Sequence, residues 1–264
     1  MAGELSFDTP DAVRFVEARK AALRQLLSYL HNELQMHTAL DVGCGVGYLS
    51  VFLRDLGLDV VAADGREENI QEARRRYPGI AFHHVNVEDA SVQQWGTFDL
   101  VFCVGLLYHL ENPFLAIRHL YSVTSKVLVV ESMCAPGIEP SLQLLDEYHA
   151  ENQGLNYVAF YPTESCLVKM LYRAGFPFVY GFASPPDFSL YHASRWRRKE
   201  RTMLVASKER LNAMTLLQLA EPTRPWDIWA VQPGPWRMRL GRIGNLLRKF
   251  APQARPHSKV AQKT

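Results

Sequence analysis

Hydrophobic residues recur at helical spacing in the first part of the chain and in short runs after it. Between residues 11 and 34 they mark one helix face: Val13, Val16, Leu23, Leu26, Leu27 and Leu30. Apolar runs of strand length then predict strands at 38–42, 59–63, 80–87, 98–104, 126–131, 176–180 and 201–207. Helical patterns between them predict helices at 47–56, 66–77, 113–123 and 163–174. Strands separated by helices of this length predict a doubly wound, mainly parallel α/β sheet.

The chain from residue 208 onward has a different composition. Residues 208–264 carry 11 Lys/Arg against 3 Asp/Glu, whereas residues 1–207 carry 18 against 24. Prolines and tryptophans interrupt this stretch before residues 236–250, where apolar positions fall on one helical face among arginines. We therefore expect one domain over 1–207 and a basic, Pro/Trp-containing, partly disordered extension over 208–264.

The basic amphipathic segment 236–250 suits several partners. It could lie weakly on an anionic membrane surface, join a second copy of the chain or contact nucleic acid. Docking on its own domain is the commonest explanation for such a segment. The sequence leaves this choice and the oligomeric state open.

Composition excludes several classes of protein. The chain is 48% hydrophobic and 21% charged over 264 residues, which is ordinary for a globular protein and too apolar for wholesale disorder. The four cysteines show no C-x-x-C pair and no metal-ligand spacing, so we expect neither a disulfide scaffold nor a metal site. The start lacks a basic stretch followed by an apolar one, and no run reaches about 18 apolar residues. We expect a cytoplasmic protein.

A glycine-rich turn follows the first predicted strand. It reads Leu40-Asp41-Val42-Gly43-Cys44-Gly45-Val46-Gly47, in which three glycines alternate with small residues. A dinucleotide-binding turn would carry a further glycine at position 48, where this chain has Tyr. The acid two residues before the first glycine suits a cationic amino group. The turn therefore favours a zwitterionic ligand over a diphosphate.

Carboxylates follow the second and third strands. Asp64 lies 21 residues after Gly43, the usual spacing for a carboxylate that accepts hydrogen bonds from ribose hydroxyls. Alone, Asp64 could equally cap the next helix. Asn86-Val87-Glu88-Asp89 then offers an edge for adenine, with Asp89 placed to accept from its exocyclic amine.

Together these features resemble the class I S-adenosylmethionine-dependent methyltransferases. LDVGCGVG is similar to that family's first motif, VVAAD to its acidic second motif, NVED to its adenine-side segment and FDLVFCVGLLYHLENP to its fourth-strand motif. The resemblance covers roughly residues 11–207. It implies a Rossmann-like sheet of seven strands in the order 3-2-1-4-5-7-6, with the last strand antiparallel, and S-adenosyl-L-methionine as cofactor.

The resemblance also implies which residues bind that cofactor. Arg19, on the leading helix, is either a partner for the cofactor carboxylate or a surface residue. Around the methionine part we expect Asp41, Gly43, Cys44, Gly45 and Gly47; at the ribose Asp64; at the adenine Val87, Glu88 and Asp89; and near the sulfonium Cys103, Val104 and Gly105.

Residues 105–113, GLLYHLENP, look most like a branch that includes tRNA wobble-uridine carboxymethyltransferases and many small-molecule and sugar O-methyltransferases. The carboxymethyl branch uses extra basic residues whose motif is not found upstream here. We therefore favour ordinary methyl transfer to a hydroxyl of a small molecule or glycan. The alternatives are a tRNA-modifying (carboxy)methyltransferase and a cofactor-binding scaffold that acts through its tail without catalysis.

Methyl transfer is an in-line displacement, so alignment and water exclusion can supply most of the acceleration. A hydroxyl acceptor also needs a base, and His109, beside Tyr108, has the right position and ordinary pKa. The other interpretation is that Tyr108 and His109 pack the loop before Pro113.

Two long connections, 133–162 and 181–200, converge on the carboxyl ends of the strands, where doubly wound sheets bind ligands. We expect them to form the acceptor pocket, although their aromatic and basic residues suit the packing surface of a lid equally well. The expected pocket residues are Glu131, Tyr148, His149, Tyr157, Tyr161, Tyr191, His192 and Arg195.

Overall fold

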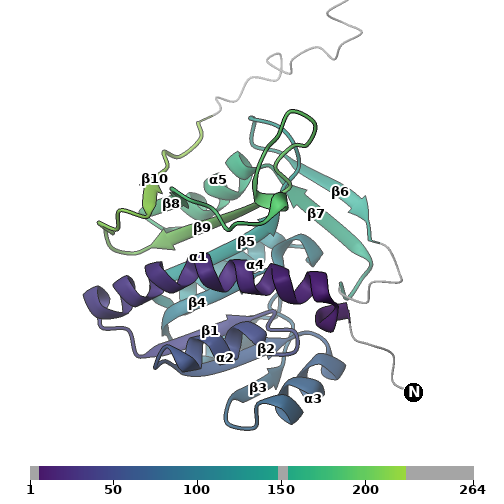
Figure 1. Cartoon of the computed structure of the whole chain (residues 1–264), viewed down its shortest axis with the longest axis vertical. Coiled ribbons are helices and arrows are strands. Elements are labelled where there is room, and N and C mark those ends of the chain that lie inside the picture. The colour runs from purple at the N-terminus through teal and green to yellow at the C-terminus, as the bar shows by residue number, and fades with distance from the viewer. Residues whose placement is uncertain (1–5, 148–153, 224–264) are drawn as a thin grey trace, which may run out of the picture. The chain divides into compact units, whose positions relative to one another are not determined.

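An eight-stranded sheet forms the centre of the fold, and its strands lie in the order β10-β8-β9-β5-β4-β1-β2-β3 (Figure 1). The computed structural model describes residues 6–147 and 154–223. The strands of this sheet are β1 Thr38–Val42, β2 Asp59–Asp64, β3 Ala81–His84, β4 Phe98–Val104, β5 Thr124–Met133, β8 Phe178–Phe182, β9 Arg201–Ser207 and β10 Leu216–Gln218.

Five neighbouring strands, β3-β2-β1-β4-β5, are parallel, and β9 lies antiparallel between β5 and β8. This arrangement confirms the expected α/β class and the order 3-2-1-4-5-7-6, with β8 and β9 as the sixth and seventh strands. The edge strand β10 is an addition that the sequence did not predict. It pairs only Leu216–Gln218 with Phe182–Tyr180, and so short a strand leaves no recognisable periodicity.

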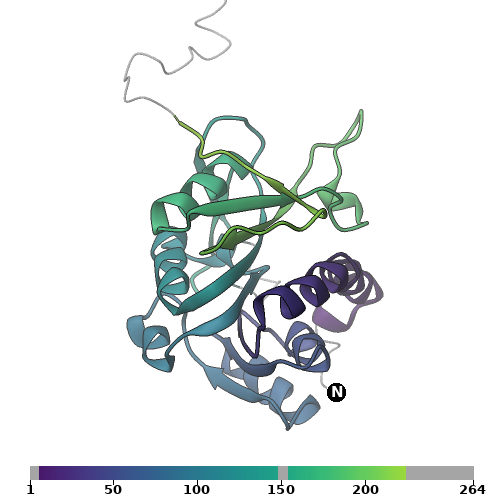
Figure 2. The same cartoon turned by 90° about the vertical axis from the view of Figure 1, so that its left-hand side faces the viewer.

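Helices cover both faces of the sheet, as the edge-on view in Figure 2 shows. On one face, α1 contributes the buried stripe Leu23, Leu26, Leu27 and Leu30, which packs on the sheet beside apolar residues of α2 and α3. On the other face, α4 and α5 pack on the opposite side chains of β1, β4 and β5. The helices are α1 Pro10–Leu34, α2 Tyr48–Asp55, α3 Glu67–Arg76, α4 Pro113–Val123 and α5 Glu164–Ala174, with 3-10 helices η1 Ser6–Asp8, η2 Ala90–Trp95, η3 Leu107–His109 and η4 Ser189–Tyr191.

A separate antiparallel hairpin, β6 Leu142–Asp146 and β7 Val158–Pro162, occupies the connection between β5 and α5. Figure 1 shows it extending beyond the main sheet at the upper right. We expected only a long connection here. All five residues of β6 are exposed, so the strand lacks the alternation of buried and polar positions that would reveal it.

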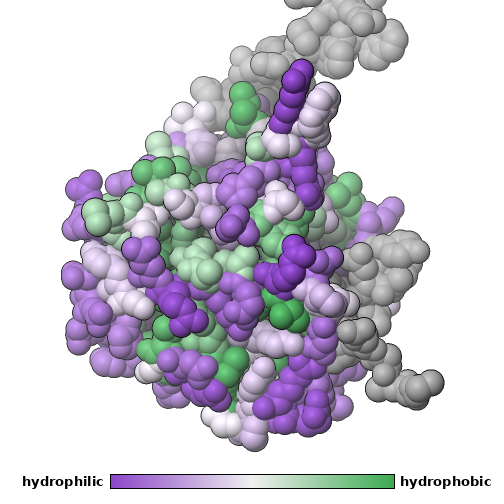
Figure 3. Space-filling view, in the orientation of Figure 1, coloured by the Kyte–Doolittle hydropathy of each residue, from purple (hydrophilic) through white to green (hydrophobic). Residues whose placement is uncertain are grey.

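The surface around α1 carries mixed side chains. Figure 3 shows apolar areas separated by hydrophilic ones on this face. No helix among the described residues is long and apolar enough to cross a membrane.

The expected helix at 236–250 lies outside the described residues, whereas β10 lies within the stretch expected as extension. The division at residue 207 therefore stays a prediction.

Candidate functional site

The glycine-rich turn connects β1 to α2 at the carboxyl edge of the sheet. Gly43 and Gly45 have φ values of +74° and +54°, which residues with side chains rarely adopt. A Cβ on Gly43 would lie 2.8 Å from Leu106 Cβ, and the Gly43 amide donates to the Ala63 carbonyl at 2.8 Å. Glycine therefore lets the turn lie flat against the ends of β2 and β4.

Two cavities open on either side of Gly43, which lines both. The larger, about 200 Å³, lies between α1, the glycine turn and the end of β4, and the smaller is about 40 Å³. The expected cofactor residues that line the larger cavity are Arg19, Asp41, Gly43, Cys44, Gly45, Val104 and Gly105. Those that line the smaller one are Gly43, Asp64 and Val87.

Asp64 holds the turn in place from the end of β2. One carboxylate oxygen accepts the Gly45 amide at 2.9 Å, and the other accepts the Arg66 amide at 2.9 Å and the Asn69 side chain at 3.1 Å. The N-cap of α3 is Arg66, so Asp64 contacts the start of that helix without being its cap, and the alternative of Asp64 as an N-cap is wrong. The side chain also lines the smaller cavity. Asp64 thus connects the glycine turn, the start of α3 and that cavity.

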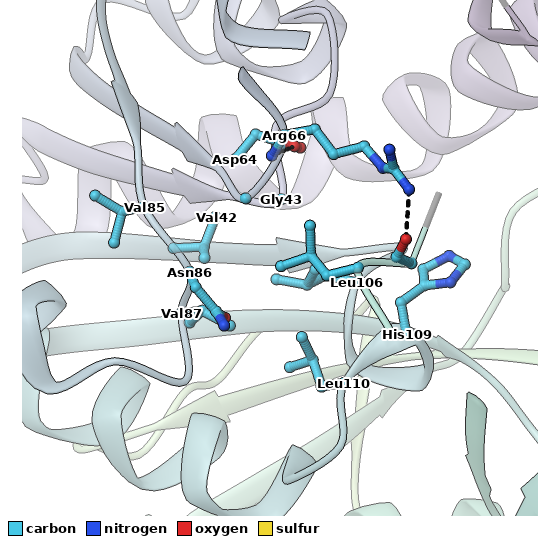
Figure 4. A pocket seen from close by; sticks show the side chains of 13 residues that line it. Val42, Gly43, Asp64, Arg66, Val85, Asn86, Val87, Leu106, His109 and Leu110 are labelled. Carbon is cyan, nitrogen blue, oxygen red and sulfur yellow. Dashed lines mark hydrogen bonds between the residues drawn. The ribbon is translucent and has the colours of Figure 1, made fainter. Parts of the chain in front are cut away.

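Figure 4 shows the smaller cavity between Asp64 and the segment that follows β3. Val85, Asn86 and Val87 line one side, and Leu106 and Leu110 line another. At the far side, the Arg66 guanidinium donates to the carbonyl of Gly154, which belongs to the connection between β6 and β7 (Figure 4). The cavity therefore offers apolar faces together with polar edges.

Four expected cofactor residues lie outside the lining of both cavities. Gly47, at φ +90°, is the N-cap of α2, and a Cβ there would meet Phe82 and Tyr77. Glu88 instead accepts the backbone and side-chain N–H groups of Asn112, at 2.7 and 3.0 Å. Asp89 is exposed, and Cys103 is completely buried in the apolar cluster on the α4 and α5 face of the sheet. Their expected contacts with a ligand stay predictions.

Asp41 is the buried acid of the larger cavity. Only 1% of it is exposed, and the Ser50 hydroxyl donates to it at 2.6 Å. Burial raises its pKa to about 7, since it disfavours the charged form; the Ser50 hydrogen bond opposes this rise and nearby Asp64 adds to it. A cation that entered this cavity would therefore stabilise the ionised form of Asp41.

A buried cluster of charges lies beside the larger cavity. Glu131, on β5, accepts from Arg19 at 2.6 Å, from Arg201 at 2.9 and 3.2 Å, and from the Tyr191 hydroxyl at 3.1 Å. Burial alone would raise the pKa of Glu131, but the two guanidinium groups more than offset it and lower that pKa. The cluster thus joins the expected cofactor residue Arg19 to the expected acceptor residues Glu131 and Tyr191.

Sequence reasoning missed Arg201, which lines the larger cavity from the first position of β9. Its Nη2 donates to the Tyr108 hydroxyl at 2.9 Å. Its Nε is buried and has no hydrogen-bond partner among the described residues. Tyr161 packs edge-on against Tyr108, with ring centroids 5.8 Å apart. The cavity wall therefore combines an aromatic surface with a guanidinium group that can donate hydrogen bonds to an anionic ligand.

His109, in η3, lines the smaller cavity. Its Nδ1 lies 2.5 Å from a carboxylate oxygen of Glu147, and the two side chains are only 10% and 9% exposed. The Tyr108 and His109 ring centroids are 4.0 Å apart. Sequence analysis did not anticipate Glu147, because the residues are 38 positions apart and the intervening hairpin carried no signal. Both the base role and the packing role of His109 fit this position.

The other expected acceptor residues are dispersed. Tyr157 is 41% exposed, and a ring nitrogen of His192 lies 3.0 Å from the Pro186 carbonyl. Arg195 is exposed and stacks on Trp196 at the surface. Tyr148 and His149 lie outside the described residues. Within the part of the chain that the structure describes, no group of three or more His, Cys, Asp or Glu side chains could hold a metal ion.

Parts of the chain are similar to known proteins. Residues 39–126 match the family model described as "Methyltransferase domain". The chain is 33% identical over 93 residues to a ubiquinone biosynthesis O-methyltransferase of Bordetella avium, covering 34% of this chain and 39% of that protein. It is 30% identical over 159 residues to a tRNA U34 carboxymethyltransferase of Pseudomonas putida, covering 55% of this chain and 47% of the relative. The chain thus spans less than half the length of these two curated relatives.

Solved structures share the fold at low identity. The N-terminal domain of EvdMO1 with SAH bound has a TM-score of 0.57 and 21% identity, over 70% of this chain and 80% of that one. Magnesium protoporphyrin IX methyltransferase (ChlM) from Synechocystis with bound SAM has a TM-score of 0.51 and 20% identity, over 79% of this chain and 87% of that one. The described residues therefore share the fold of these two proteins, whose structures hold SAH and SAM.

Proposed function

We propose that this chain is a methyltransferase that uses S-adenosyl-L-methionine as its cofactor. The observation that carries the proposal is the glycine turn with an acid on each side, buried Asp41 in the larger cavity and half-buried Asp64 in the smaller. This pair suits a ligand with a cationic amino group at one end and a ribose at the other. The methyltransferase domain match over residues 39–126 supports the same conclusion.

The residues present fit such a cofactor. Asp41 would face its amino group and Arg19 its carboxylate from the larger cavity. Asp64 would accept from the ribose hydroxyls, with Asn86 and Val87 along the adenine. The bound cofactor supplies an electrophilic methyl group on a sulfonium, and the protein's part is to align the acceptor with it and to exclude water.

The acceptor in this proposal is a hydroxyl of a small molecule. Tyr108 and Tyr161 meet edge-on near the larger cavity and offer apolar ring surface to an aromatic or glycosidic acceptor. His109 would take the hydroxyl proton. Glu147 would hold the imidazole in one orientation and stabilise it once protonated, as carboxylates do for catalytic histidines elsewhere. The similarity to ubiquinone biosynthesis O-methyltransferases also favours a small hydroxylated acceptor.

One observation favours a second candidate, carboxymethyl transfer to tRNA. The unpartnered Nε of Arg201 and the Tyr108 hydroxyl sit on the cavity wall near Gly105, where a carboxylate on the transferred group would find two donors. The similarity to a tRNA U34 carboxymethyltransferase supports this alternative.

A transfer assay tests the proposal. The full chain is incubated with methyl-tritiated S-adenosylmethionine and fractionated cell extract, and label is followed into small molecules, RNA and protein. We expect label in small molecules that survives nuclease treatment and that, at limiting cofactor, is strongly reduced with the Asp64→Ala variant. Label confined to nuclease-sensitive material would favour tRNA. No transfer into any fraction, in spite of cofactor binding, would support a non-catalytic scaffold.

A further inference from the structure

Tyr48 occupies the position where a dinucleotide-binding turn would carry its third glycine. It is the first residue of α2, and it lines the larger cavity. Its hydroxyl donates to a carboxylate oxygen of Asp8 at 2.6 Å. Tyr48 therefore connects the cavity wall to η1, the short segment that precedes α1.

Asp8 is held more firmly by the last residue of α3. Arg76 donates to both Asp8 oxygens, at 2.8 and 2.6 Å, and its Nε donates to Glu72 at 2.6 Å. The Arg76 hydrogen bonds lower the pKa of Asp8 to about 2, although partial burial opposes this. The carboxylate is therefore ionised at neutral pH and forms a bidentate ion pair with the guanidinium. These contacts fasten η1 to two helices that come much later in the chain.

Phe7, the neighbour of Asp8, lies over the glycine turn. It lines the larger cavity, and its ring edge is 3.0 Å from the point where a Cβ on Gly45 would stand. Figure 1 shows this segment as the dark purple turn at the right-hand end of α1. Because Thr9 caps α1 immediately afterwards, the ring and the carboxylate belong to one short unit at the start of that helix.

We propose that Asp8, Tyr48 and Arg76 form a latch that keeps Phe7 closed over the methionine half of the cofactor cavity. Opening the latch would lift η1 from the glycine turn and let the cofactor enter or leave. Asp8 is a positioning residue in this account, since it acts through Phe7 and touches no reacting atom. The inference rests on the proposed function, because it concerns retention of the cofactor.

Salt should act on this latch. The Arg76 and Asp8 side chains are 17% and 29% exposed, so dissolved ions can reach the pair and screen it. Each hydrogen bond to a charged group contributes modestly on balance, and loss of the ion pair should make release of the cofactor product about 5- to 30-fold faster.

The test is the rate at which the full chain releases S-adenosylhomocysteine, measured by stopped flow. Asp8→Asn keeps the side-chain shape and removes the charge, and we expect about 5- to 30-fold faster release. Asp11→Asn is the matched control. Asp11 lies three residues further on, in the first turn of α1, and pairs with Arg14 at 3.4 Å, with both side chains largely exposed. Its release rate should stay within about twofold of the wild type, because surface pairs contribute little.

Two further measurements separate a latch from general weakening of the fold. Raising salt from about 50 to 500 mM should accelerate release from the wild type and leave Asp8→Asn nearly unchanged. Phe7→Ala keeps the ion pair but removes the ring through which that pair acts, so it should also release faster and should lose most of the salt dependence. Thermal unfolding of each variant shows whether it is folded at the assay temperature.

The outcomes distinguish the latch from the proposed function. Wild-type release rates in both Asp8→Asn and Phe7→Ala, with binding intact, would overturn the latch and leave the proposed function standing. Failure of the wild type to bind either S-adenosylmethionine or S-adenosylhomocysteine would overturn both.

Discussion

Binding of the cofactor should release a proton from Asp41. The carboxyl is buried in the larger cavity with a pKa of about 7 against an ordinary value of 3.8. That difference corresponds to roughly 4 kcal/mol disfavouring the ionised form in the unliganded protein. A ligand ammonium group beside Asp41 would reverse this preference, so the complex would hold the carboxylate ionised.

The number of protons released on binding follows from the pKa of Asp41. At pH 6 Asp41 is mostly protonated in the unliganded protein, and binding should release close to one proton. At pH 8 the carboxyl is already mostly ionised, and the release should fall away. The assay is calorimetric titration with S-adenosylhomocysteine in buffers of low and high ionisation enthalpy. The difference in observed heat between buffers measures the proton count, and Asp41→Asn should remove most of it.

The same pKa predicts a pH slope in stability. The folded state binds more protons than the unfolded one between about pH 4 and pH 7, so the free energy of unfolding should fall as pH rises through that window. Asp41→Asn should flatten this slope and be the more stable protein at pH 8. Buffer-independent heats at pH 6, or equal proton release in Asp41→Asn, would refute the reasoning about Asp41.

Three further predictions concern other residues of the site. Asp64→Ala removes the hydrogen bond to the Gly45 amide and those proposed to the ribose, and should weaken S-adenosylhomocysteine binding by about 1.5–3 kcal/mol in a calorimetric titration; unchanged affinity would limit Asp64 to a structural role. Glu131→Gln leaves two buried guanidinium groups without their counter-charge, and should lower the free energy of unfolding in urea by about 3–5 kcal/mol. A loss below about 1 kcal/mol would contradict the claim that Glu131 stabilises the two buried arginines. His109→Ala should lower turnover of a hydroxyl acceptor about 100-fold with little change in cofactor affinity, and a loss under about threefold would retire the base role.

Elements with a strong local signal were predictable from the sequence. The expected strands 98–104 and 201–207 and the expected helix 113–123 agree with β4, β9 and α4 at both ends. The expected strand 80–87 ends earlier, at His84, because Val85, Asn86 and Val87 leave the sheet to line the smaller cavity. Apolar pattern alone cannot separate residues buried in a sheet from residues that face a ligand cavity.

The site was predictable where it depends on one turn and not where distant segments meet. The positions of Asp41 and Asp64 on opposite sides of the glycine turn follow from the ends of β1 and β2. Arg201 and Glu147 carried no signal, because each acquires its partner only when separate elements come together. The same holds for Tyr48, which in the sequence only interrupted a glycine pattern but in the structure binds Asp8.

The most direct test of the central claim is a calorimetric titration of the full chain with S-adenosylhomocysteine and, separately, with NAD. We expect binding of S-adenosylhomocysteine with a dissociation constant on the order of micromolar and no heat with NAD. The physical reason is that Tyr48 stands where a diphosphate would need glycine, while Asp41 offers a carboxylate to an amino group. Tight NAD binding without heat from S-adenosylhomocysteine would contradict the account.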